Sequence, residues 1–267
     1  MLRSFRYLLF PFSLIYGAAV WMRNRLFDKN ILKSSGFNFP IICVGNLAAG
    51  GTGKTPMTEY LLRFLKKDFK TATLSRGYKR KTTGFAIANE QTTALEIGDE
   101  PMQFHQKFPD VVVAVGEERL VAIPQLLHER PETEVIILDD AFQHRQVQAG
   151  LNILLTDYSD LYTRDLMLPA GNLRDVRSSS ARADIIVVTK CPAAITKEEK
   201  RKIIDEIGPT DRQQVFFTTI VYGKPYHLFG RQELELAQDF AVLLVCGIAN
   251  PAPLKTYLTD TVHTYDL

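Results

Sequence analysis

The chain has 267 residues, of which 46% are of hydrophobic types and 23% are charged. This composition is typical of a globular protein and excludes disordered, collagen-like and coiled-coil chains. Lysine and arginine exceed aspartate and glutamate only slightly, 32 against 30, so a strongly basic nucleic-acid-binding protein is not expected. The three cysteines, Cys43, Cys191 and Cys246, lie far apart and follow no metal-binding or disulfide spacing, which fits a reducing compartment.

The charge is concentrated at the N-terminus. Residues 1–33 carry a net charge of +5, and the rest of the chain carries −3. No charged side chain occurs between Tyr7 and Met22. Because a membrane-spanning helix needs about 20 apolar residues, this run predicts either a short span or a helix lying in the bilayer interface. A packed N-terminal helix and a cleaved signal peptide are the alternatives.

Downstream of this run, short apolar segments alternate with amphipathic ones. Buried strands are predicted at 41–44, 71–74, 111–115, 135–138, 152–155 and 185–188. Helices are predicted at 54–67, 100–107, 118–128 and 197–207. The polar segment 79–98 predicts a loop or a hairpin. Continuous apolar strands between helices are typical of an α/β fold with a mostly parallel sheet and helices on both faces.

The pattern changes after about residue 210. A strand with aromatic residues is predicted at 215–222, a buried strand at 241–246 and a helix at 251–258. We therefore predict three parts: a membrane-associated N-terminal helix over 1–27, a nucleotide-binding domain over 28–212, and linker strands with a partial second α/β domain over 213–267.

A glycine-rich loop follows the first predicted strand and precedes an amphipathic helix. The phosphate-loop pattern is G-x-x-x-x-G-K-[ST], and the chain matches its end but has Ala48 in place of the first glycine. Small residues let backbone N–H groups approach phosphate oxygens at a helix N-terminus. The predicted nucleotide-binding residues are Ala49, Gly50, Gly51, Thr52, Gly53, Lys54 and Thr55. Lys54 would reach the β- and γ-phosphates of ATP, and Thr55 would bind Mg²⁺.

Two adjacent carboxylates end the apolar strand at 135–138. Asp139 and Asp140 occupy the place of a Walker-B acid, which holds Mg²⁺ directly or through water. The alternative is that one of them only caps the following turn. The sequence does not indicate which of the two lies nearer the metal.

Taken together, the motifs resemble the tetraacyldisaccharide 4'-kinase family. The matching segments are 44–56 with the phosphate loop, 75–78 (SRGY), 98–101 (GDEP), 139–145 (DDAFQHR) and 168–175 (LPAGNLRD), with a weaker match at Gly247-Ile248 and Pro251. The resemblance implies an ATP- and Mg²⁺-dependent transfer of the γ-phosphoryl group to the 4'-hydroxyl of a lipid A precursor disaccharide. It also implies a location at the inner membrane, peripheral or anchored by one helix, with the catalytic domain on the cytoplasmic side. Inner-membrane lipid is the expected partner; no nucleic acid and no obligate protein partner are expected.

The resemblance also assigns roles to single residues. Asp99 is the expected base for the sugar hydroxyl, with an N-cap as the alternative. Arg174, in a Pro- and Gly-containing loop, is expected to stabilise the transferring phosphoryl group, and Glu100 to assist with Mg²⁺. The substrate or its surroundings would be contacted by Arg76, Arg119, Gln143 and His144. The resemblance favours Arg76 and Arg119, with solvated surface arginines as the alternative, and a structural histidine is the alternative for His144.

One family feature is not matched. The family carries an Asp-His motif in its C-terminal domain, and His263 is not preceded by aspartate, so the role is not transferred to it. The sequence alone therefore leaves two alternatives open: a membrane-attached phosphate-loop ATPase or switch without an acceptor, and a C-terminally incomplete chain that binds ATP without completing the transfer.

Overall fold

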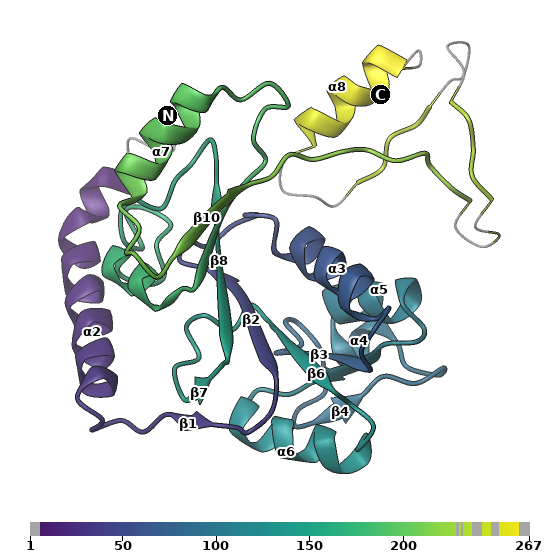
Figure 1. Cartoon of the computed structure of the whole chain (residues 1–267), viewed down its shortest axis with the longest axis horizontal. Coiled ribbons are helices and arrows are strands. Elements are labelled where there is room, and N and C mark those ends of the chain that lie inside the picture. The colour runs from purple at the N-terminus through teal and green to yellow at the C-terminus, as the bar shows by residue number, and fades with distance from the viewer. Residues whose placement is uncertain (1–5, 228–229, 231, 237–241, 247–250, 262–267) are drawn as a thin grey trace. The chain divides into compact units, whose positions relative to one another are not determined.

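Figure 1 shows a computed structural model of the chain, which describes residues 6–227, 230, 232–236, 242–246 and 251–261. The chain divides into two compact units, residues 1–218 and 219–267. His263, Gly247-Ile248 and residue 241 of the predicted strand at 241–246 lie outside the described residues.

The first unit is built on an eight-stranded sheet in the order β10-β9-β8-β2-β6-β3-β5-β4. The strands are β2 (Ile41–Asn46), β3 (Thr71–Ser75), β4 (Ala86–Ile87), β5 (Val112–Val115), β6 (Val135–Asp139), β8 (Leu151–Asp157), β9 (Ile185–Thr189) and β10 (Gln214–Phe217). All neighbouring pairs are parallel except the short edge pair of β4 and β5. The predicted mostly parallel sheet is confirmed, and β2, which precedes the glycine-rich loop, lies inside it.

Helices cover both faces of the sheet. The helices are α3 (Lys54–Leu65), α4 (Ala94–Ile97), α5 (Asp99–Lys107), α6 (Arg119–Glu129) and α7 (Lys197–Ile207). Leu62 of α3 and Phe104 of α5 belong to one buried cluster, whereas Ile123 of α6 and Ile203 of α7 belong to a second. Two separate apolar clusters are expected when a sheet is buried on both sides.

The N-terminal segment forms a short 3₁₀ helix (η1, Tyr7–Leu9) and the long helix α2 (Phe10–Asp28), drawn in purple in Figure 1. Pro11 sits in its first turn, where the missing N–H costs no hydrogen bond. Beyond α2, β1 (Ser35–Gly36) pairs with β7 (Val147–Gln148) as a separate two-stranded sheet. Within the described residues, no helix combines the length and the apolar character that crossing a bilayer requires.

Two sequence predictions are corrected. The predicted strand at 215–222 is observed only as β10, which ends at Phe217, close to the end of its partner β9 at Thr189. The backbone of Thr218 still hydrogen-bonds to Val188 and Cys191, and residues 219–222 form no strand. Residues 243–246, predicted as a buried strand, form none, and Leu243 and Val245 are exposed. The second unit instead contains the helix α8 (Ala252–Thr261), close to the predicted helix at 251–258, and stacked rings of Tyr222 and Tyr257.

Candidate active site

The glycine-rich loop joins the end of β2 to the start of α3, as the strand–loop–helix pattern predicts. Gly50 and Gly53 have φ values of 136° and 85°, which L side chains rarely adopt, so glycine is required at both turns. Ala49 donates its backbone N–H to the carbonyl of Asn172 at 2.7 Å. The loop therefore presents the positive end of α3 while it is tied to the distant segment that contains Arg174.

Asn46, the last residue of β2, organises the interior of this loop. Its side chain is fully buried, and its amide nitrogen donates to the Ala48 carbonyl at 2.7 Å and to Thr52 Oγ1 at 2.8 Å. Its amide oxygen accepts from Lys54 Nζ at 3.4 Å and from Arg174 at 2.5 Å. Asn46 is not among the site residues predicted from the sequence, although a polar side chain at the carboxyl end of an apolar strand was a usable signal.

The two strand-end carboxylates lie in different environments. Asp139 is buried, and burial, followed by the negative charges of Glu100 and Asp140, raises its pKa to about 7. Burial alone would also raise the pKa of Asp140, but hydrogen bonds from Arg174 and the charge of Lys54 outweigh it and hold that pKa below its ordinary value. Asp140 is therefore the acid already paired with cations, and Asp139 is a buried acid that a further cation would stabilise.

Arg174 connects three parts of the site. Its guanidinium contacts both carboxylate oxygens of Asp140, at 2.8 and 3.1 Å, and also reaches Asn46. Lys54 Nζ lies 3.8 Å from the same Asp140 carboxylate. Two cations and one carboxylate thus converge beside the glycine-rich loop, which is the electrostatic arrangement that binds phosphoryl groups.

The acidic start of α5 faces the start of α3. Thr55 Oγ1 lies 3.2 Å from a Glu100 carboxylate oxygen, and Thr58 Oγ1 donates to Asp139 at 3.1 Å. Asp99 precedes Glu100 at the first position of α5 and is exposed. The N-cap of α5 is Gly98, so Asp99 occupies the first helical position and is not the N-cap residue.

The remaining predicted residues gather near the paired acids. Gln143 donates to the Asn46 carbonyl at 2.6 Å. Arg119 is buried, with Nε and one terminal nitrogen lacking a partner among the described residues. Burial lowers its pKa to about 10 against the stabilising charge of Asp139. Burial, with the charges of Arg119 and Arg76, lowers the pKa of His144 to about 4, so this imidazole is neutral at pH 7.

Two residues at the end of β9 also contact the loop. Thr189 Oγ1 donates to the Thr52 carbonyl at 2.8 Å, and Lys190 binds the carbonyl of Gly51 and, at 2.7 Å, the carboxylate of Asp157. Neither residue was selected from the sequence, although the position of Thr189-Lys190 at the end of a predicted strand was a usable signal.

The donors near Thr55 are hard oxygen atoms. Among the residues that the structure describes, no three His, Cys, Asp or Glu side chains form a metal-holding group by themselves. Mg²⁺ ordinarily takes only one or two protein carboxylates and fills its other positions with phosphate and water oxygens. The hydroxyl of Thr55 with Asp139, Asp140 and Glu100 fits such a shared site.

A mostly parallel sheet, a glycine-rich loop leading into α3, a lysine in its first turn and acids at the end of an adjacent strand together define a phosphate-loop nucleotide-binding protein. Comparison with known proteins then gives the family. Residues 5–265 match the family model described as tetraacyldisaccharide-1-P 4'-kinase, and the chain belongs to this family.

Individual relatives agree with this assignment. The chain is 51% identical to the tetraacyldisaccharide 4'-kinase of Flavobacterium johnsoniae over 258 residues, covering 96% of this chain and 75% of that protein. It is also 51% identical to the one of Phocaeicola vulgatus, covering 92% of this chain and 69% of that protein. A solved structure, the "apo" form of LpxK from Aquifex aeolicus in complex with ATP, is 33% identical with a TM-score of 0.65 and covers 83% of both chains.

Proposed function

We propose that this chain transfers the γ-phosphoryl group of ATP to the 4'-hydroxyl of a tetraacyldisaccharide 1-phosphate, the lipid A precursor. The observation that carries the proposal is the convergence of Lys54 and Arg174 on Asp140 beside the glycine-rich loop. It is supported by the family match and by a solved relative, LpxK from Aquifex aeolicus, in complex with ATP.

In this proposal the loop N–H groups and Lys54 bind the ATP phosphates. Arg174 turns from Asp140 toward the transferring group, where a planar guanidinium stabilises charge spread over the phosphoryl oxygens. Mg²⁺, held by Thr55 with Asp139, Asp140 or Glu100, supplies neutralisation of the phosphate charge when it is bound. Asp99 accepts the proton of the sugar hydroxyl, which is a weak nucleophile until the proton is removed.

The acceptor side of the site is lined by residues whose charge state suits an anionic, polar lipid head. Arg76 and Arg119 are cations near a neutral His144. Because two buried guanidinium nitrogens of Arg119 have no partner among the described residues, a phosphate or sugar oxygen that reached them would satisfy them. We assign Arg76, Arg119, Gln143 and His144 to the acceptor or to the groups that orient it.

The membrane partner is proposed from α2. Large apolar side chains of this helix are exposed, including Phe12, Leu14, Ile15, Trp21 and Met22. An exposed apolar patch of this kind marks an interaction site, and Trp beside Arg25 is typical of a helix at the lipid headgroup level. We propose that α2 lies on the inner membrane, where the acyl chains of the acceptor are held.

The experiment incubates the chain with ATP, Mg²⁺ and the disaccharide-1-phosphate lipid in mixed micelles and follows conversion of the monophosphorylated to the bisphosphorylated lipid. Asp99→Ala should leave ATP binding nearly unchanged and lower turnover by a factor of about 10² or more. Asp110→Asn, an exposed acid beyond the end of α5, is the matched control. ATP hydrolysis without lipid phosphorylation by the unaltered chain would refute the proposal and favour an ATPase.

A further inference from the structure

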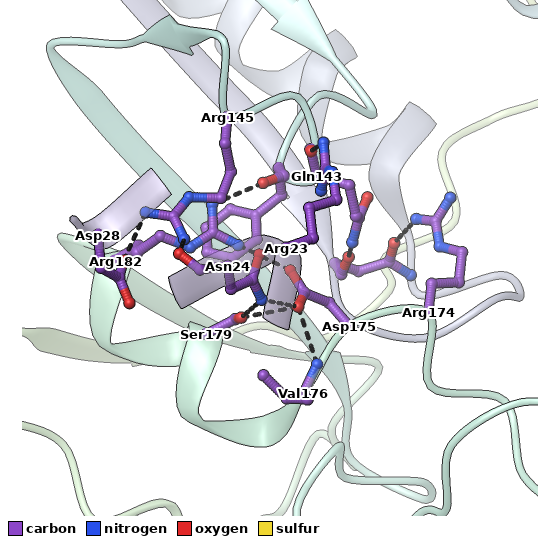
Figure 2. A network of polar contacts seen from close by, with 12 residues as sticks. Arg23, Asn24, Asp28, Gln143, Arg145, Arg174, Asp175, Val176, Ser179 and Arg182 are labelled. Atoms are coloured by element: carbon purple, nitrogen blue, oxygen red, sulfur yellow. Dashed lines mark hydrogen bonds and ion pairs between the residues drawn. The ribbon is translucent and has the colours of Figure 1, made fainter. Parts of the chain in front are cut away.

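The loop that contains Arg174 is held in place by helix α2. Figure 2 shows the polar contacts at this junction, which join residues about 150 positions apart in the sequence. Tyr16 Oη donates to the carbonyl of Arg174 at 3.0 Å, while the backbone N–H of Arg174 donates to Leu47 at 2.7 Å. The backbone of Arg174 is therefore fixed on one side by the glycine-rich loop and on the other by α2.

The next residue, Asp175, is the centre of the junction. Asn24 of α2 donates its amide N–H to Asp175 Oδ1 at 2.7 Å and lies 3.1 Å from Ser179 Oγ. Ser179 Oγ and the N–H of Val176 also donate to Asp175 Oδ1, both at 2.8 Å. Arg182 donates to the other oxygen at 2.8 Å. These contacts satisfy a carboxylate that is only 1% exposed, which is the condition for keeping a charge buried.

Further contacts of the N-terminal segment are directed at the same loop. Ser13 Oγ accepts from the N–H of Ala170 at 2.9 Å, and Arg6 donates to the Pro169 carbonyl at 3.1 Å and to the Asn172 side chain at 3.0 Å. Arg6 and Ser13 thus contact the protein, whereas the large exposed side chains of α2 are apolar.

The placement of Asn24 is difficult to explain by helix stability alone. Asparagine is a poor helix former, and its side-chain oxygen here is buried without a partner among the described residues. Keeping an amide with one unsatisfied buried oxygen is unfavourable, and an apolar residue could not make the amide contacts with Asp175 and Ser179. The visible effect is the contact with Asp175, beside Arg174.

We propose that Asn24 is a positioning residue for phosphoryl transfer: through Asp175 it holds Arg174 at the distance from which its guanidinium reaches the transferring phosphoryl group. It touches neither ATP nor the acceptor. The same helix presents the apolar face assigned above to the membrane, so the element that lies on the lipid also orients the phosphoryl-binding arginine. The inference rests on the proposed kinase activity.

The test uses the full chain and measures kcat, KM for ATP and the affinity for an ATP analogue. Asn24→Ala removes the amide, and Asn24→Asp places a second carboxylate against Asp175. Both should lower kcat by about tenfold or more, since misplacing a catalytic group by about 1 Å has effects of that size. The affinity for the ATP analogue should change by less than about threefold, because Lys54 and the glycine-rich loop do not contact Asn24.

Two further variants separate positioning from general stability. The swap Asn24→Asp with Asp175→Asn restores an amide–carboxylate pair and should recover part of the kcat lost in Asn24→Asp, although it gives up the ion pair of Asp175 with Arg182. Asp28→Asn, one turn further along α2, removes an acid that contacts Arg145 instead of Asp175, and should leave kcat unchanged. Binding to vesicles of phosphatidylethanolamine and phosphatidylglycerol should be the same for all these variants.

The outcomes are distinct. If the unaltered chain transfers no phosphate, the proposed function fails. If it does, and folded Asn24→Ala and Asn24→Asp are equally fast, the positioning role fails alone. Parallel losses of kcat, ATP-analogue affinity and melting temperature, or a swap that is slower than Asn24→Asp, would also overturn it, since these results would indicate a purely structural contact.

Discussion

Asp139 gives the sharpest test of the site's electrostatics, because its ionisation opposes folding in the absence of ligands. The carboxyl is 2% exposed, and its pKa rises from 3.8 to about 7, mainly through burial. A carboxyl with a raised folded-state pKa contributes stability that is complete below the unfolded value and is lost as the pH rises through the folded value. We therefore expect the ligand-free chain to lose stability from this group between about pH 4 and pH 7.

The size of the effect follows from the pKa change. A pKa difference from 3.8 to about 7 corresponds to an upper limit of about 4 kcal/mol in the free energy of unfolding. Asp139→Asn removes the charge and keeps an oxygen that accepts from Thr58. At pH 8, without Mg²⁺ or nucleotide, this variant should be more stable than the unaltered chain. The advantage should shrink by about 2 kcal/mol between pH 8 and pH 5.5.

The assay is urea unfolding followed by circular dichroism in EDTA at several pH values. Asp140→Asn is the matched control with the opposite sign. The pKa of Asp140 is lowered by Arg174 and Lys54 against burial, so its contribution is present at high pH and lost as the pH falls. If Asp139→Asn is less stable than the unaltered chain at pH 8, or if its effect is independent of pH, the electrostatic reasoning is wrong. The affinity of Asp139→Asn for Mg²⁺ with an ATP analogue should fall. The negative charge of the Asp139 carboxylate opposes folding without ligands, and the same charge would attract the cation.

Three other outcomes are expected. Arg174→Lys should lower kcat by a factor of about 10² in the lipid phosphorylation assay, because a lysine cannot make the paired contacts of a guanidinium. The affinity for an ATP analogue should change little. An unchanged kcat would mean that Arg174 does not act in the transfer step. Gly45→Ala should cost about 1–3 kcal/mol in urea unfolding, because its new Cβ would lie 2.6 Å from Phe142 Cβ; normal stability would mean that this strand can shift. The double substitution Phe12→Glu, Ile15→Glu should weaken sedimentation with phosphatidylglycerol vesicles. The melting temperature should stay the same, since both side chains are exposed. Equal sedimentation would show that α2 is not the lipid-binding surface.

The sequence predicts the structure best where a local pattern of residues is sufficient to define an element. The order of strand, glycine-rich loop and amphipathic helix appears as β2, the loop and α3, because each element depends on residues within a few positions of one another. The strand ending at Asp139 was predictable for the same reason. Both elements end at one edge of a parallel sheet, so their functional groups come together without further information.

Contacts between distant segments were not predictable in this way. Asn46 joins Lys54 to Arg174, which is 128 positions away, and Thr189 reaches the loop across 137 positions. Spacing in the chain carries no signal for such pairs. The predicted strand at 215–222 ends early for a related reason: apolar and aromatic composition favours a strand, but only a neighbouring strand provides hydrogen-bond partners for it.

The structure changes the interpretation of the positive charge of residues 1–33. On the sequence alone, this charge flanks the apolar run for which a membrane-associated helix is predicted. The structure shows that Arg6 binds the loop before Arg174 and that Arg23 donates to the Gln143 carbonyl at 3.2 Å. These two arginines serve contacts within the protein, so the local charge overstates the attraction to a membrane. The exposed apolar side chains of α2 are then the stronger argument for lipid, because removing them from water needs no charge complementarity. Binding to neutral vesicles should therefore persist at salt concentrations that screen the remaining basic residues.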